Sequence, residues 1–386
     1  MEFRLSEEEE KFQKDVHDFL AKEVTEEVVL EAEGGQGFGP HAWGFIRKLG
    51  ARGWLCPMLP KEYGGFDAPF MFRWILNNEQ HYFLPEMLTV NGASIVAPTI
   101  NLYGTEEQKK EYLPRIARGE IEFALGYSEP GSGSDLASVS TRAVEQEDCY
   151  VINGQKTYNT GCHYAQYYWL LVRTEDTTPK HRGLSLFIVD MKSQGIALQA
   201  MHTLAGERTN EVFLDNVRVP KENLVGQKNR GFYHVATALD YERVFPIGHC
   251  QRTFEGIVEY ATEAKRNGMP LTKNPLVRQE LAQRAVEIEV GRMLAYRTAW
   301  QLGKGIVGAY EAAALKIFVS ELEQRLGTTG MHIMGLYGQL QASSKWVPLQ
   351  GMLELWHRSR TRRTISAGTS EIQRNVIATR GLGLPR

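Results

Sequence analysis

The stretch that decides the fold lies near the C-terminus and reads Ser366-Ala367-Gly368-Thr369-Ser370-Glu371-Ile372-Gln373-Arg374-Asn375. Its second residue is an alanine, whose side chain has no group that accepts a proton. A second polar stretch farther upstream, Asp240-Tyr241-Glu242-Arg243, does contain a proton-accepting carboxylate. The upstream stretch therefore has a proton-accepting side chain at Glu242, whereas the C-terminal stretch has none at Ala367.

The bulk properties are those of an ordinary soluble globular protein. The chain has 386 residues, which predicts two or three domains and a large buried core. Hydrophobic residues make up 42% and charged residues 23% of the sequence. The formal net charge of -2 gives no global field that attracts nucleic acid or an anionic membrane, and we expect neither as a partner. We interpret the one basic run, His357–Arg363, as a solvated helix face.

Cysteine usage and the N-terminus predict a cytoplasmic protein. Cys56, Cys149, Cys162 and Cys250 show neither close pairing nor metal-ligand spacing, which predicts a reducing compartment and no metal site. The N-terminal residues lack the charge and hydropathy of a signal peptide. No apolar stretch has the length that spans a bilayer.

The pattern along the chain predicts a mainly α protein with a central β-domain. We expect an N-terminal helical domain over 1–120, a middle β-domain over 121–226 and a C-terminal helical bundle over 227–386. Ser6 and Glu9 form a capping box that begins the first helix, and Gly34–Gly37 ends it.

Three short apolar runs in the middle block predict strands, Tyr167–Arg173, Leu184–Asp190 and Glu211–Val219. Asn153-Gly154 predicts a two-residue hairpin turn. In the C-terminal block, Pro246 cannot donate a hydrogen bond to the carbonyl of Glu242, which predicts a helix kink beside that residue.

A glycine- and serine-rich loop, Tyr127–Asp135, follows a predicted strand. Gly131 and Gly133 let backbone amides approach a ligand, and the serine hydroxyls add donors. Taken alone, the loop is compatible with a flavin edge, a phosphate or an ordinary turn. The sequence has no G-x-G-x-x-G after a strand, which argues against a Rossmann dinucleotide site.

Four motifs together resemble the acyl-CoA dehydrogenase family. They are the glycine-serine loop, Gly154–Thr160, Asp240–Arg243 and Gly368–Gln373, in the family's order and approximate spacing. The resemblance extends over essentially the whole chain, including Pro60–Gly65. It implies an N-terminal α-domain, a β-barrel-like middle domain, a C-terminal four-helix bundle, and FAD as the cofactor.

The resemblance also implies roles for single residues. In most well-known members the catalytic glutamate precedes the Gly-Thr pair, where this chain has Ala367; isovaleryl- and long-chain-type members place it at the position of Glu242. Glu242 is therefore the expected catalytic base. The expected cofactor contacts are Leu125, Tyr127, Ser128, Ser134, Tyr158, Thr160, His332, Gly335, Thr369 and Glu371, with His332 reaching a neighbouring subunit's FAD. The expected substrate contacts are Ser134, Asp240, Arg243 and Gly368.

One segment departs from the family pattern. Members commonly carry an Arg-x-x-Phe that reaches FAD across the subunit interface, whereas this chain has Ala264-Lys265-Arg266-Asn267-Gly268. Lys265 or Arg266 supplies a charge there. The departure leaves open whether the expected tetramer contains identical or different subunits.

The implied reaction is the α,β-dehydrogenation of an acyl-CoA thioester to the trans-2-enoyl-CoA. The base removes the α-proton, the β-hydrogen passes as hydride to flavin N5, and electrons continue to an electron-transferring flavoprotein. General-base help contributes roughly 10²–10⁴ in rate. The C-terminal tail is similar to that of members acting on branched, cyclic, aromatic or steroid side-chain thioesters.

Three alternatives stay open. A lyase or decarboxylating relative would keep the enolate chemistry without net oxidation. A non-catalytic subunit of a mixed complex would not turn over by itself. At the residue level, Glu242 is also compatible with a partly buried carboxylate that pairs with Arg243 and has no catalytic role.

Overall fold

The computed structural model describes residues 4–33, 38–84, 90–242, 245–306 and 309–385. For residues 33, 238–242 and 309 it describes the backbone alone. Gly34–Gly37, the expected end of the first helix, lies outside the described residues.

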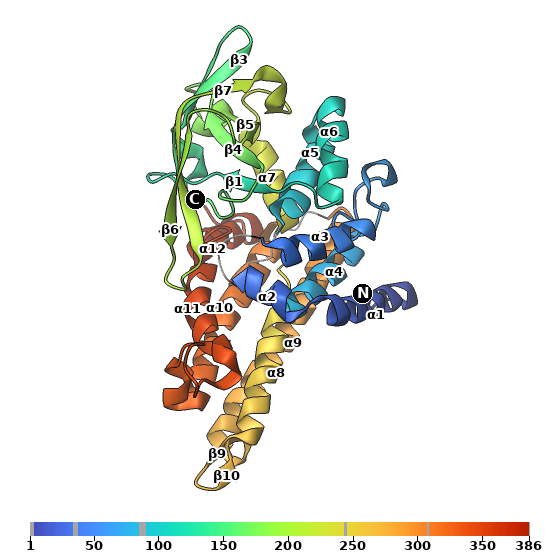
Figure 1. Cartoon of the computed structure of the whole chain (residues 1–386), viewed down its shortest axis with the longest axis vertical. Helices are drawn as coiled ribbons and strands as arrows, with labels where there is room; N and C mark the ends of the chain where they lie inside the picture. Colours follow the sequence, from blue (N-terminus) through green and yellow to red (C-terminus); the bar gives the residue numbers. More distant parts are fainter. Residues whose placement is uncertain (1–3, 34–37, 85–89, 243–244, 307–308, 386) are drawn as a thin grey trace. The chain divides into compact units, whose positions relative to one another are not determined.

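The chain forms two compact units, which are coloured by sequence in Figure 1. The helical unit comprises Met1–Lys22, Phe70–Leu84 and Arg243–Arg386. The sheet unit comprises Glu23–Pro69 and Pro85–Glu242. Each unit is therefore assembled from segments that are distant in sequence, and the boundaries at 120/121 and 226/227 stay a prediction.

An eight-stranded sheet forms the centre of the sheet unit. Its order is β6-β7-β3-β2-β4-β5-β8, and β1 pairs in parallel with β4. The predicted strands Tyr167–Arg173 and Leu184–Asp190 are confirmed as β4 and β5, and Glu211–Val219 lies within β7. The remaining strands are β1 (Phe123–Gly126), β2 (Arg142–Glu145), β3 (Cys149–Lys156), β6 (Ile196–His202), β7 (Arg208–Pro220) and β8 (Leu224–Val225).

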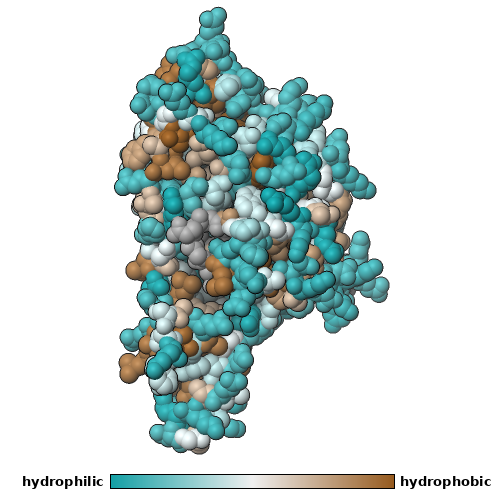
Figure 2. Space-filling view, in the orientation of Figure 1, coloured by the Kyte–Doolittle hydropathy of each residue, from teal (hydrophilic) through white to brown (hydrophobic). Residues whose placement is uncertain are grey.

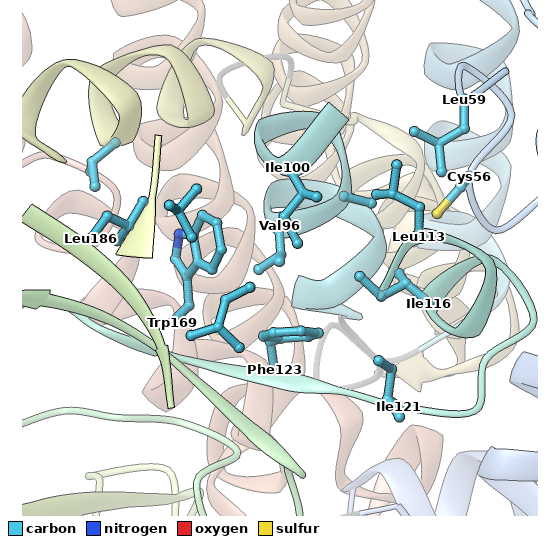
Figure 3. Close-up of a cluster of buried hydrophobic side chains, with 14 of the residues drawn as sticks. Cys56, Leu59, Val96, Ile100, Leu113, Ile116, Ile121, Phe123, Trp169 and Leu186 are labelled. Atoms are coloured by element: carbon cyan, nitrogen blue, oxygen red, sulfur yellow. The ribbon is translucent and has the colours of Figure 1, made fainter. Parts of the chain in front are cut away.

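Strands β4 and β5 are apolar along most of their length because both of their faces are buried. Trp169 and Leu186 face a cluster that includes Phe123 and helix residues, as Figure 3 shows. The alternate residues Tyr168 and Phe187 belong to a second cluster with residues of β3 and β7. The helices of this unit are α2 (Glu26–Glu33), α3 (Pro40–Ala51), α5 (Ala97–Tyr103), α6 (Glu106–Ala117) and α7 (Gly231–Glu242).

The predicted hairpin at Asn153-Gly154 is wrong. Both residues lie inside β3, where the register with β7 shifts between Ile152 and Gly154. Asn153 accepts a hydrogen bond from the Asn216 amide at 2.8 Å. Ile152 pairs with Val217 and Gly154 with Leu214, so the extra residue lies in β7, where Asn216 has φ 53°. Gly154 adopts φ 150°, which a side chain would disfavour, and the Asn-Gly pair continues the strand instead of forming a turn.

The helical unit begins with the predicted capping box. The Glu9 carboxylate accepts from the Ser6 amide at 2.7 Å, and the Ser6 hydroxyl accepts from the Glu9 amide at 3.3 Å. A two-stranded hairpin accompanies the helices, with Asn267 and Gly268 both at positive φ in its turn. The elements are α1 (Glu7–Glu23), α4 (Phe70–Phe83), α8 (Gly248–Glu263), β9 (Lys265–Arg266), β10 (Met269–Pro270), α9 (Pro275–Gly303), α10 (Ala309–Met334), α11 (Met352–Ser359) and α12 (Ser370–Val376).

Pro246 separates two helices, whereas we had expected a kink within one. Helix α7 ends at Glu242, and α8 begins at Gly248. The amides of Ile247 and Gly248 donate to the Asn78 side chain, each at 3.0 Å. These bonds satisfy donors that the first turn of α8 leaves without helical partners.

Hydrophobic patches interrupt a mostly hydrophilic surface on the face drawn in Figure 2. Several large apolar side chains of the helical unit are exposed, among them Leu336, Tyr337 and Trp346. Among the described helices, we find none with the length and apolar character that a membrane crossing requires.

Candidate active site

Strand β1 and the loop that follows it hold four of the predicted contacts. Leu125 lies in β1, while Tyr127 and Ser128 follow it directly. Leu125 and Tyr127 pack against the cluster of Figure 3, and Ser128 is half-buried. Ser134 lies farther along the loop and is exposed. The loop therefore has a buried base and an accessible tip.

The segment after β3 meets the base of this loop. The Thr157 amide donates to the Ser128 carbonyl at 2.9 Å. The next residue, Tyr158, has a left-handed backbone with φ 58° and a side chain that is 69% exposed. Thr160 is also exposed, and its hydroxyl lies 3.4 Å from that of Thr209. The fold thus brings Ser128, Tyr158 and Thr160 to one site of the sheet unit.

The residues at this site fit a flavin. An aromatic ring left exposed beside accessible hydroxyls matches a flat ring system with polar edges. A Cβ added at Gly131 or Gly133 would meet no atom within 4 Å. The loop tip is therefore open, and the described residues leave room for a side chain at both glycine positions.

The C-terminal stretch forms a tight turn that leads into α12 in the helical unit. Ala367 and Gly368 both have a left-handed backbone, with φ 53° and 83°. Thr369 is the N-cap of α12, and its hydroxyl accepts from the Ile372 amide at 3.2 Å. Gln373 folds back and donates to the Ala367 carbonyl at 3.3 Å. The side chain at 367 is a methyl group, so this turn offers no side-chain proton acceptor at that position.

Glu371 and His332 do not lie at the same place in the helical unit. Glu371 is in the first turn of α12, whose Arg374 pairs with Glu321 of α10 at 2.5 Å. His332 lies about three turns farther along α10, roughly 16 Å from Glu321 along the axis. Gly335 follows the end of α10 with φ 59°. Which FAD molecule each of the two residues contacts stays a prediction.

Helix α7 positions the predicted base, Glu242, as its last residue. Within the sheet unit, the Thr237 hydroxyl lies 3.0 Å from that of Tyr103, whose ring lies 4.3 Å from the His234 ring. The side chains of Asp240 and Glu242 and all of Arg243 lie outside the described residues, so their contacts stay a prediction.

The basic run at His357–Arg363 is not a solvated face. Arg360 is buried, and Arg363 contacts the buried Glu323 at 3.0 Å. His249 of α8 contacts the same carboxylate at 2.7 Å. Burial raises the pKa of Glu323, but Arg363 and His249 outweigh that effect and lower it to about 2.

His249, Cys250 and Glu323 are close enough to hold a metal ion, since their ligand atoms lie within 4.8 Å of one another. However, the Glu323 carboxylate already faces the guanidinium groups of Arg360 and Arg363. Two adjacent cations disfavour a third, so this cluster is better described as an ion-pair network.

Sequence reasoning missed the residues that support the site. These supporting side chains are Glu129, Lys156, Glu323 and Gln373. Glu129 and Lys156 lie in motifs that were already singled out, and their opposite charges were the available signal. No local pattern marks Glu323, because its partners come from two other segments.

Family models match almost the whole chain. They are described as the N-terminal, middle and C-terminal domains of acyl-CoA dehydrogenase, and they match residues 6–120, 124–217 and 229–382. "Acyl-CoA dehydrogenase FadE26" of Mycobacterium tuberculosis is 36% identical, and the match covers 98% of this chain and 97% of that protein.

Two solved structures share the fold over their full lengths. "Tcur3481-Tcur3483 steroid ACAD" has a TM-score of 0.92 and 33% identity, covering 100% of both chains. The "ChsE4-ChsE5 complex from Mycobacterium tuberculosis" has a TM-score of 0.92 and 34% identity, again covering 100% of both chains. The predicted architecture is confirmed, and this chain belongs to the acyl-CoA dehydrogenase family, whose members are FAD-dependent oxidoreductases.

Proposed function

We propose that this chain dehydrogenates a bulky acyl-CoA thioester and uses Glu242 as the catalytic base. The observation that carries the proposal is the turn at Ala367. Its backbone is left-handed and the Ala367 carbonyl accepts from Gln373, yet its side chain has no proton acceptor. The other family position for the base is occupied by Glu242, at the end of α7.

In the proposed mechanism the Glu242 carboxylate accepts the α-proton of the thioester, and the C–H electron pair becomes the new α,β double bond. FAD, when bound, supplies the oxidation by accepting the β-hydrogen as hydride. Ser128, Tyr158, Thr160, Thr369 and Glu371 would hold the cofactor. Arg243 balances the charge of Glu242, since a nearby cation lowers a carboxylate pKa. A backbone amide near Gly368 would stabilise the developing enolate oxygen, and one such donor contributes about 2.7–4 kcal/mol.

The proposed substrate class is a cyclic or steroid side-chain thioester. Alanine at position 367 leaves more volume than the glutamate found there in most members. The similarity to a structure described as a steroid dehydrogenase supports the same class. Ser134 and Asp240 complete the proposed substrate contacts.

We further propose a cytoplasmic tetramer that passes its electrons to an electron-transferring flavoprotein. Leu336, Tyr337 and Trp346 expose apolar surface that an assembled neighbour would cover. His332, Gly335 and Lys265 or Arg266 would then serve the neighbour's cofactor. A second, different subunit is a candidate partner, because the similar ChsE4-ChsE5 structure is described as a complex of two proteins.

Replacing Glu242 with glutamine tests the proposed base. Glu242→Gln preserves size, so we expect retained FAD and thioester binding with a rate lower by about 10²–10⁴. Substrate should no longer bleach the flavin absorbance in a stopped-flow experiment. Rapid bleaching by Glu242→Gln would contradict this assignment.

The matched control relocates the carboxylate within the same protein. Glu242→Gly combined with Ala367→Glu should recover part of the activity if both positions reach the same α-carbon. An oxidised flavin with a product lacking the enoyl absorbance would instead indicate a lyase. An inactive wild-type chain that gains activity only when a partner chain is added would indicate a subunit of a mixed complex.

A further inference from the structure

A fully buried ion pair lies at the base of the loop that carries Ser128. Lys156 of β3 donates to the Glu129 carboxylate at 2.9 Å. The side chain of Lys156 is 0% exposed and that of Glu129 is 4% exposed. Two charges in the interior are costly to desolvate, so their retention calls for a specific reason.

Hydrogen bonds surround the Glu129 carboxylate. It accepts from the Ser140 amide and hydroxyl, both at 2.7 Å, and from the Thr141 amide at 2.9 Å. Burial raises the pKa of Glu129, but Lys156 and these donors outweigh it and lower the pKa to about 2. Burial lowers the pKa of Lys156 to about 8 against the opposing effect of Glu129. Both groups are therefore charged at neutral pH.

The pair connects the two segments that hold the proposed flavin contacts. Lys156 also donates to the Tyr127 carbonyl at 3.0 Å, so its ammonium bonds residues on both sides of Ser128. Along its own segment, Lys156 precedes Tyr158 by two residues. Tyr158 keeps a left-handed backbone, which a tyrosine adopts only when its surroundings impose it.

We propose that the Glu129–Lys156 ion pair is a positioning device that sets the spacing between Ser128 and Tyr158. This inference rests on the proposed function, because it assumes that both residues face the flavin. Neither charged group contacts the reacting atoms in this assignment, and each acts through the backbone of its neighbours.

If the Glu129–Lys156 pair only stabilised the fold, its replacement would have a different effect from the one that a positioning role predicts. Well-packed uncharged side chains of similar volume often replace a buried ion pair without loss of stability, whereas removing one partner leaves an uncompensated charge. Only the ion pair, however, holds the Tyr127 carbonyl and the Glu129 carboxylate through one ammonium group. The double variant should therefore recover stability but keep an altered cofactor geometry.

The test compares Glu129→Gln, Lys156→Met and the double variant with the wild-type holoenzyme. We expect each single variant to melt at a lower temperature and the double variant to recover most of the loss. In the double variant the visible circular dichroism of bound FAD should still differ from wild type. Its kcat should fall by about 10- to 100-fold, because small misplacements at a reaction centre have effects of that size.

The matched control removes the same two residue types elsewhere in the sheet unit. Lys228 and Glu145 form an exposed pair at 2.6 Å, and Lys228→Met with Glu145→Gln should leave the FAD spectrum and kcat unchanged. A Glu129–Lys156 double variant that recovers melting temperature, FAD spectrum and kcat together would overturn the inference. A wild-type chain that binds no FAD would instead contradict the proposed function.

Discussion

At the scale of single residues, Glu122 has the most unusual environment among the described carboxylates outside the proposed site. It is 1% exposed, and one of its oxygens accepts from the Gly92 amide at 3.0 Å. The other oxygen has no hydrogen-bond partner among the described residues. Burial raises the pKa of Glu122 to about 8 against the opposing effect of backbone donors at Gly92, Phe123 and Asn91. The carboxyl group is therefore mainly protonated in the folded protein at neutral pH.

Glu122→Gln should make the protein more stable at alkaline pH. The unfolded carboxyl ionises near pH 4.5 and the folded one near 8, so Glu122 favours unfolding increasingly as pH rises between these values. The difference amounts to roughly 5 kcal/mol at most. We expect the variant's gain in melting temperature over wild type to be larger at about pH 9 than at about pH 5.

Glu120→Gln is the control for this prediction, because Glu120 lies two residues away and is exposed. It should show no such gain. Equal shifts at both pH values for Glu122→Gln would mean that Glu122 is ionised in the folded state.

At the scale of elements, α10 joins several parts of the helical unit through one carboxylate. Glu323 contacts His249 of α8 and Arg363 beyond α11, while its backbone carbonyl accepts from Trp356 of α11 at 2.9 Å. Arg360 lies 4.0 Å from the Trp356 ring. This network secures the chain just before the turn at Ala367.

Glu323→Gln should destabilise the helical unit strongly. Removing one partner of a buried ion pair costs about 3–5 kcal/mol, and the Glu323 side chain is 0% exposed. Because the folded pKa of Glu323 is about 2, its contribution is present above about pH 4.5 and is lost as pH falls through 2. Thermal melting at neutral pH measures the effect.

Glu321→Gln is a matched control on the same helix. Its side chain is 34% exposed and pairs with Arg374 and Arg325. Partly exposed pairs contribute about 0–1 kcal/mol, so this variant should melt close to wild type. If both variants lose the same stability, the network around Glu323 is not the cause.

At the scale of the whole molecule, the proposed function requires contacts that one chain does not complete. In the proposed assembly His332 contacts the FAD of a neighbouring subunit, whereas Glu371 contacts the FAD of its own chain. Leu336 and Trp346 are exposed at 83% and 68%, so their apolar surface is available for a neighbouring subunit to cover.

The purified protein should therefore be yellow, contain tightly bound FAD and have a mass near four chains. Light scattering and the flavin spectrum measure these properties. A colourless monomer that FAD does not reconstitute would contradict the assembly. If adding a second chain is required for colour, the tetramer contains different subunits.

The turnover rate should also depend on the electron acceptor. We expect turnover to be much faster with electron-transferring flavoprotein than with dioxygen, since bound product shields the reduced flavin in this family. Peroxide released in equal amount to product at the full rate would identify an oxidase instead.

The sequence by itself indicated the family, three strands of the sheet, and the lack of a proton-accepting side chain at position 367. Strands such as Tyr167–Arg173 were predictable because burial on both faces imposes a continuous apolar run. The capping box at Ser6 and Glu9 was predictable because its partners are three residues apart.

Only the tertiary structure decided the features that depend on distant partners. Asn153-Gly154 stays within a strand because β7 pairs across it. Arg360 is buried and Arg363 is paired because Glu323 of α10 lies against both of them. Glu129 and Lys156 form a pair only when the loop after β1 meets the end of β3. Local sequence specifies turns and periodicity, but it does not specify which charges meet in the interior, because chain folding selects those partners from segments far apart in sequence.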